Sequence, residues 1–384
     1  MRALVKAINA MNIIERNWRR RIAQLTPQEW AETLYSETGE DAFEVDNPGT
    51  VMKLLFLWNY MLFPYLYIMA SRRAGQRARN RRAKLFYLDP YAGNGLVKVR
   101  VGSESIIIPG SSVLALLAPI MLHETRTPGY PYYWDIMVLN DINDKYRTQL
   151  ITRYKFILNR LSTLGHLYRI YSELPLTALE DRVVAFTDFE CEQQMTWSEF
   201  RRFFEIVKGK DGWIHGLIFL DPPSPKEMPL RFLGELLSIP SDVIALLHTG
   251  IFADNVNMRR YTPDTLASIL NCDIREAESL LQDTHTMEEL ENLYVQKFRE
   301  LLQVTTMRDI ISGSPTRNFI KPIRLSTGKR HYHLVVATRT TGGKKYKEWQ
   351  NWLEMFAKKV EKLSDLDRLV IDILSGKQAK LNSK

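Results

Sequence analysis

Cysteine is scarce in this chain, with only Cys191 and Cys272 among its 384 residues. The two are far apart in the sequence and neither has a flanking histidine, so neither a disulfide framework nor a zinc site is predicted. No metal is expected, and a reducing compartment, the cytoplasm, is the expected location. The N-terminal segment also lacks the uninterrupted apolar core and small-residue cleavage site of a secretory signal.

Long uncharged apolar runs are nearly absent too. One run, Leu54 to Ala70, has about the 17 residues that can barely cross a bilayer. Asn59 and Pro64 interrupt it, its aromatic residues are spread along its length, and Lys53 directly precedes it. We therefore expect a buried core helix, with a membrane-attached protein as the weaker alternative.

Acidic residues are fewer than basic ones, 44 against 52, which gives a net charge of +8 and favours polyanionic partners. The basic residues are concentrated in one segment, where seven of thirteen residues are Arg or Lys. This segment is a candidate track for nucleic-acid phosphates, DNA or RNA, and a solvated helix face is the alternative. Its members are Arg72, Arg73, Arg77, Arg79, Arg81, Arg82 and Lys84.

Short apolar runs alternate with helical patterns from Leu85 onward, which predicts an α/β fold with a mostly parallel sheet covered by helices on both faces. A Rossmann-like methyltransferase sheet is the expected form. We expect the first strand to begin at Leu85 and a pair of strands to follow within 97–108. The other expected strands are 135–139, 183–186, 214–220, 242–249 and 331–337.

Four regions are expected along the chain. Residues 1–84 form an N-terminal helical layer ending in the basic segment, and 85–251 form the Rossmann-like core. Residues 252–316 are a helical insertion or cap, and 317–384 complete the core with one or more final strands and a C-terminal helix. Within the cap, two short helices around Asn271 resemble a helix-turn-helix, although two packed cap helices would give the same pattern.

The turn after the first strand, Asp89 to Gly95, is the most informative motif. Gly93 and Gly95 can adopt backbone angles that other residues avoid, and they let main-chain N–H groups approach a ligand. A dinucleotide site would show G-x-G-x-x-G, and a P-loop would end in Lys-Ser or Lys-Thr. A leading acid repels pyrophosphate but attracts an ammonium group. The turn therefore favours S-adenosylmethionine.

Acidic residues also follow the second and third strands, where ligands collect in open α/β sheets. Asp141 is placed to accept hydrogen bonds from ribose hydroxyls, and Asp188 from an adenine amino group. Either residue could instead be a helix cap.

The fourth strand ends in Asp221, Pro222, Pro223 and Ser224, where the methyl acceptor is expected. Two prolines stiffen this turn and expose carbonyl oxygens that could hold a planar amino group. Ser224 removes the aromatic ring that could stack on a base. The alternative is that Asp-Pro-Pro only ends a strand tightly.

Together these motifs resemble the three-Cys-motif partner (TcmP) family, which has a D-x-F-A-G-x-G turn, a G-S-P helix start and an F-x-D-P strand end. The matching residues here are Asp89-Pro90-Tyr91-Ala92-Gly93-Asn94-Gly95, Gly110-Ser111-Ser112 and Phe219-Leu220-Asp221-Pro222. The match extends from about Val51 to the strand at 331–337. Tyr91 replaces Phe, and Ser112 replaces Pro.

The resemblance implies the fold of adenosylmethionine-dependent methyltransferases, and it adds Tyr91, Ala92 and Ser111 to the expected cofactor site. The cysteines in the family name belong to a partner protein, so a protein partner is a further expectation. The leading functional hypothesis is a methyltransferase acting on nucleic acid. The alternative is a nucleic-acid-binding or assembly protein that kept the fold and lost catalysis.

Overall fold

The computed structural model describes residues 27–45, 48–77, 83–101, 104–125, 132–141, 143–163, 183–184, 213–237, 239–311, 319–327 and 330–338, with a few positions between 347 and 355. Two compact units are present. Unit 1 comprises residues 1–187 and 362–384, and unit 2 comprises residues 188–361. Each unit is described by itself.

The first described helix of unit 1 belongs to the predicted N-terminal helical layer. Helix α2 (Pro27–Glu37) begins with proline in its first turn, where the missing N–H costs nothing, and with Glu29 near the positive end of the helix. Its buried face carries Trp30, Ala31 and Leu34. Short strand β1 (Phe43–Val45) follows it.

The uncharged apolar run forms a buried helical segment in unit 1, as expected. Helix α3 (Pro48–Tyr60) continues through a π-helical turn (Met61–Tyr65) into α4 (Leu66–Arg77). The π-turn contains Pro64, which has no N–H for the regular helical ladder. Phe56, Tyr60 and most other described side chains of the run are buried. Among the described helices, none combines the length and apolar character needed to cross a membrane.

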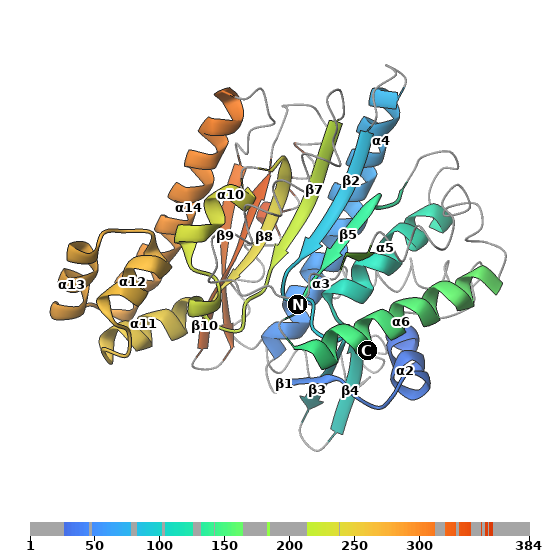
Figure 1. The fold of residues 1–384 in the computed structure, drawn as a ribbon, viewed down its shortest axis with the longest axis horizontal. Coiled ribbons are helices and arrows are strands. Elements are labelled where there is room, and N and C mark those ends of the chain that lie inside the picture. The colour runs from blue at the N-terminus through green and yellow to red at the C-terminus, as the bar shows by residue number, and fades with distance from the viewer. Residues whose placement is uncertain are drawn as a thin grey trace, which may run out of the picture. The chain divides into compact units, whose positions relative to one another are not determined.

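Three parallel strands form the main sheet of unit 1. Strand β2 (Ala83–Asp89) pairs with β5 (Ile136–Leu139), which pairs with β6 (Val183–Val184). In the sequence, α5 (Ser111–Thr125) lies between β2 and β5, and α6 (Asp144–Thr163) lies between β5 and β6. The Tyr154 hydroxyl on α6 donates a 2.7 Å hydrogen bond to the Ser112 carbonyl on α5. The carboxyl ends of β2 and β5 thus lie side by side (Figure 1).

The predicted strand pair after the first turn forms a separate small sheet. Strands β3 (Leu96–Val101) and β4 (Glu104–Pro109) are antiparallel, and β1 joins β3 in parallel register. The pairing of β1 was not predicted from the sequence, because three residues are too few to show a period.

Unit 2 contains a four-strand array. Strands β7 (Trp213–Leu220) and β8 (Ser241–Leu247) are parallel, with a 3-10 turn (Pro225–Glu227) and α10 (Leu230–Leu237) between them. Strand β10 (Arg330–Thr338) is antiparallel to β8. Strand β9 (Phe319–Thr327) forms a hairpin with β10.

The fold is thus α/β with mixed sheets. In the larger strand order β10 is antiparallel to both of its neighbours, whereas the pairs β2–β5, β5–β6 and β7–β8 are parallel, as expected. Strand β9 was not predicted from the sequence. Its segment contains Lys321, Pro322 and Arg324, which mask the alternation of a strand. Proline is tolerated at such a place because β9 ends the strand order among the described residues, and an edge strand leaves N–H positions unpaired.

The described part of the predicted helical region of unit 2 contains four helices. They are α11 (Thr249–Asn257), α12 (Pro263–Leu270), α13 (Ile274–Gln282) and α14 (Met287–Ile311). The helices α12 and α13 flank Asn271, which adopts a left-handed conformation with φ of 52°, and Thr262 and Asp273 cap their N-termini. The two short helices are confirmed.

Candidate functional site

The two glycines of the turn after β2 have positive φ angles, as predicted, but they serve different purposes. Gly93 has a φ of 61°, and a Cβ added to it would meet no atom within 4 Å. Gly95 has a φ of 88°, and its Cβ would lie 2.9 Å from Leu150 and 3.0 Å from Val113. Open space at Gly93 can admit a ligand, whereas Gly95 lets helices α5 and α6 pack closely against the turn.

Asp89 is fully buried at the end of β2. Its carboxylate accepts hydrogen bonds from the Ser111 hydroxyl at 2.5 Å, the Tyr91 N–H at 3.1 Å and the Tyr87 hydroxyl at 3.3 Å. Burial and the neighbouring carboxylate raise the pKa of Tyr87 well above its usual value. These contacts show that Asp89 and Ser111, both assigned to the cofactor from the sequence, also fix the start of the turn and of α5.

Asp141 connects the ends of β2 and β5. Its carboxylate accepts one hydrogen bond from the Gly93 N–H at 3.1 Å and another from the Asn143 N–H at 2.9 Å. Burial raises the pKa of Asp141, and the two N–H groups partly oppose that shift. Since each carboxylate oxygen can accept more than one hydrogen bond, the group can also bind a ligand hydroxyl.

Asn140 precedes Asp141 and is 1% exposed. Its backbone N–H donates to the Asp89 carbonyl at 2.9 Å, and its carbonyl accepts from the Ala92 N–H at 2.7 Å. The oxygen and nitrogen of its side-chain amide have no hydrogen-bond partner in the structure. A buried amide without partners is costly and often indicates a missing polar group or water.

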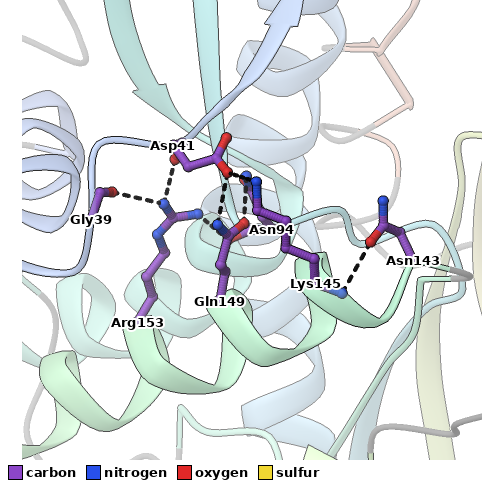
Figure 2. A network of polar contacts seen from close by, with 7 residues as sticks. All are labelled: Gly39, Asp41, Asn94, Asn143, Lys145, Gln149 and Arg153. Carbon is purple, nitrogen blue, oxygen red and sulfur yellow. Dashed lines mark hydrogen bonds and ion pairs between the residues drawn. The ribbon is translucent and has the colours of Figure 1, made fainter.

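A polar network on α6 supports the turn (Figure 2). The Arg153 guanidinium donates to the Asn94 carbonyl at 2.5 Å and also to the Asp41 carbonyl. Gln149 accepts from the Asn94 side chain at 3.2 Å and donates to the Asp41 carboxylate at 2.8 Å. The Lys145 ammonium lies 2.6 Å from the same carboxylate. The segment before β1 and the glycine turn are thereby held by one helix.

Electrostatics favour this network in its charged form. Burial lowers the pKa of Arg153 to about 10, which still leaves the guanidinium cationic at neutral pH. Hydrogen bonds from Lys145 and then Gln149 lower the pKa of Asp41. Arg153 was not among the residues predicted from the sequence, since its partners are backbone carbonyls that leave no sequence pattern.

The Asp221–Ser224 turn follows β7 in unit 2. Pro222 is buried, Pro223 is exposed, and Asp221 and Ser224 are partly buried. The Pro222 carbonyl, which was expected to be exposed, lies 2.7 Å from Nε2 of His248, the residue after β8. Because a carbonyl can only accept, Nε2 carries the proton.

His248 also contacts Tyr332 on β10, edge to face, with ring centroids 5.2 Å apart. The next residue, Thr249, has its hydroxyl 3.0 Å from Nδ1 of His333. Burial, together with the charges of Arg324 and His331, lowers the pKa of His333 to about 4. The sequence had placed His248 at the end of a strand without assigning it a role.

The candidate phosphate-binding residues do not share one environment. Arg73 is fully buried, forms an ion pair with Asp135 and donates to the Tyr133 carbonyl at 3.0 Å. It therefore serves the core and is not available to phosphates. Arg72 is partly buried on α4, and Lys84 is partly buried on β2. Arg77 ends α4. The remaining candidates, Arg79, Arg81 and Arg82, and the adenine candidate Asp188, lie outside the described residues.

The charges on α13 do not favour DNA recognition by the helix pair. Arg275, Glu276 and Glu278 are exposed on α13, and Asp273 caps it. Lys297 on α14 forms a 2.8 Å ion pair with Glu276. A helix with more acidic than basic exposed residues repels phosphates.

Metal-binding geometry is not seen in the described parts of the chain, where no three His, Cys, Asp or Glu residues are grouped suitably. The chain matches no known protein-family model. It also matches no curated protein sequence.

Proposed function

We propose that the protein binds S-adenosylmethionine at the turn after β2 and transfers the methyl group to nucleic acid, as a Rossmann-like methyltransferase related to the TcmP family. The observation that carries the proposal is the junction of Gly93 and Asp141. Gly93 is an unobstructed glycine with positive φ. Its N–H donates a 3.1 Å hydrogen bond to the carboxylate of Asp141, which follows the neighbouring strand. In parallel sheets this edge is where nucleotide ligands collect.

Two further observations in unit 1 support the cofactor half. The strand order β6-β5-β2 is that of one half of a doubly wound nucleotide-binding sheet. The unpartnered amide of Asn140 next to the turn also suggests that a polar group is missing. The donor set fits the cofactor: Gly93 offers close backbone approach, and Asp141 offers acceptors for ribose hydroxyls.

The cofactor half is testable by calorimetric titration with S-adenosylmethionine. Asp141→Ala removes the acceptors for the ribose hydroxyls, and we expect affinity to fall roughly tenfold or more, the effect of losing one or two charged hydrogen bonds. Gly93→Val fills the open space and should abolish binding. Thr152→Ala, an exposed substitution on α6, is the control. Unchanged affinity in both site variants would reject the assignment.

The nucleic-acid half rests on the net charge of +8, on the basic residues of the Arg72–Lys84 segment other than the buried Arg73, and on the Asp221–Ser224 turn. Incubation with isotope-labelled cofactor and mixed DNA or RNA should transfer label to the nucleic acid. In a matched reaction Asp221→Asn should reduce transfer without reducing cofactor binding.

A second candidate function is nucleic-acid binding without catalysis. It is favoured by the internal hydrogen bonds of Asp89 and by Ser224, which provides no stacking ring. A crevice can persist after its chemistry is lost. Retarded migration of nucleic acid without label transfer would support this candidate over the enzyme.

A further inference from the structure

The Asp221–Ser224 turn is held by a side chain from the neighbouring strand. Strands β7 and β8 run in parallel register, with Leu220 opposite Ala245, so their carboxyl ends are adjacent. His248 follows β8 and donates from Nε2 to the Pro222 carbonyl at 2.7 Å. This hydrogen bond fixes both the tautomer of His248 and the position of its ring relative to the turn.

The ring of His248 is held on a second side as well. Tyr332 packs against it edge to face, at an interplanar angle of 73°, and is itself 5% exposed. His248 is only partly buried, whereas its neighbours Leu247 and Thr249 are fully buried. The residue keeps part of its surface exposed although Nδ1 is buried. A planar ring that is fixed in orientation is suited to stacking, because little conformational freedom is lost on binding.

We propose that His248 is the base-stacking residue of the acceptor site and takes the role that an aromatic side chain at position 224 would have. The proposal rests on the proposed function and specifies its acceptor: an unpaired nucleobase that lies on the imidazole beside the proline turn. Stacking requires only the π-face of the base, so single-stranded nucleic acid is the expected class.

Fluorescence anisotropy with short single-stranded DNA oligonucleotides provides the test. Two oligonucleotides of equal charge are compared, one with adenine and one with an abasic site at the central position. Equal charge cancels the contribution of phosphate contacts to the difference. The wild-type protein should bind the adenine oligonucleotide roughly tenfold more tightly, as expected for loss of one stacked base.

Two variants separate stacking from support of the turn. His248→Gln retains a donor for the Pro222 carbonyl but has no ring, and the preference for adenine should disappear. His248→Phe retains a ring without the donor, and most of the preference should remain. Adding Ser224→Tyr to His248→Gln should restore it, since the ring is then supplied from the turn. Circular dichroism melting establishes that each variant is folded.

Three results would overturn the proposal. The wild type could bind both oligonucleotides equally, His248→Gln could keep the full preference for adenine, or folded His248→Phe could lose as much of that preference as His248→Gln. Each measurement omits the cofactor. Failure of S-adenosylmethionine binding would therefore reject the proposed function while leaving the stacking result intact, and the reverse also holds.

Discussion

The turns after β2 and β7 both begin with an aspartate at the end of a buried strand, yet they are held in different ways. The Asp89–Gly95 turn is hydrogen-bonded to its surroundings through Asp141, Ser111 and Arg153. The Asp221–Ser224 turn contains two proline rings, and it accepts hydrogen bonds from His248 at the Pro222 carbonyl and from the nearby Glu227 N–H at the Ser224 carbonyl. The first conformation is imposed by partners, whereas the second is largely set by the covalent structure of proline.

This difference has a consequence for how each turn responds to substitution. Partners distributed over α5, α6 and the segment before β1 make the first turn sensitive to changes far away in the sequence. A turn whose backbone angles are largely set by its own proline rings is affected mainly by changes close to it. Predictions about stability can therefore test whether the two turns are as different as their contacts indicate.

The largest effect is expected for Arg153→Ala. Several backbone carbonyls, those of Asn94 and Asp41 among them, lose a charged donor, and each buried carbonyl left without a partner costs about 1–3 kcal/mol. The free energy of unfolding of the protein should fall by about 3–4 kcal/mol, measured by urea denaturation. Thr152→Ala on the same helix should change it by less than about 0.5 kcal/mol.

Arg153→Lys refines the same experiment. A single ammonium keeps the charge but does not reproduce the planar fork, so we expect an intermediate loss of stability. If Arg153→Ala were as stable as the wild type, the network in Figure 2 would not be what holds the glycine turn.

The next largest effect is expected for Gly95→Ala, in comparison with Gly93→Ala. Both add a Cβ at positive φ, which costs about 1–2 kcal/mol. At Gly95 the new atom also collides with Leu150 and Val113, so the total loss should be about 2–4 kcal/mol. Thermal melting of the two variants measures the difference. Equal melting temperatures would mean that α5 and α6 can shift to accommodate the added methyl group.

The glycine turn was predictable from the sequence because its cause is local. A G-x-G motif after an apolar run requires positive φ, and both angles have this sign. The helices at 263–270 and 274–282 were predictable for the same reason, since Thr262 and Asp273 are recognisable caps. In each case the residues that determine the structure are within a few positions of it.

Long-range features were not predictable in this way. In the sequence Arg153 is indistinguishable from the other basic residues of an amphipathic helix. The carbonyl that accepts its hydrogen bond belongs to Asn94, which is 59 residues away. From the sequence His248 is only the end of a strand, and its contacts come from Pro222 in the turn after β7 and from Tyr332 on β10. Burial of Arg73 likewise depends on Asp135, so counting charges in the basic segment could not separate it from its neighbours.

The smallest effect concerns the surroundings of the second turn and depends on pH. His333 lies beside Thr249, the residue after His248, with 3.0 Å between Nδ1 and the Thr249 hydroxyl. Burial lowers the pKa of His333 from 6.5 to about 4. In the unfolded chain His333 takes up a proton as the pH falls below about 6.5, whereas the folded protein resists protonation until about pH 4. Acid therefore favours unfolding across this window, and stability is fully present above it.

Between pH 7 and pH 5 this linkage should lower the free energy of unfolding of the protein by up to about 2 kcal/mol, from about 1.4 kcal/mol per pKa unit. Urea denaturation of the wild type and of His333→Gln at both pH values measures it. The variant has no titratable ring, so its stability should decrease less on acidification, while all other titrating groups contribute equally to both proteins. Identical pH dependence in the two would show that His333 is solvated, and that the region around the second turn is less closely packed than its contacts indicate.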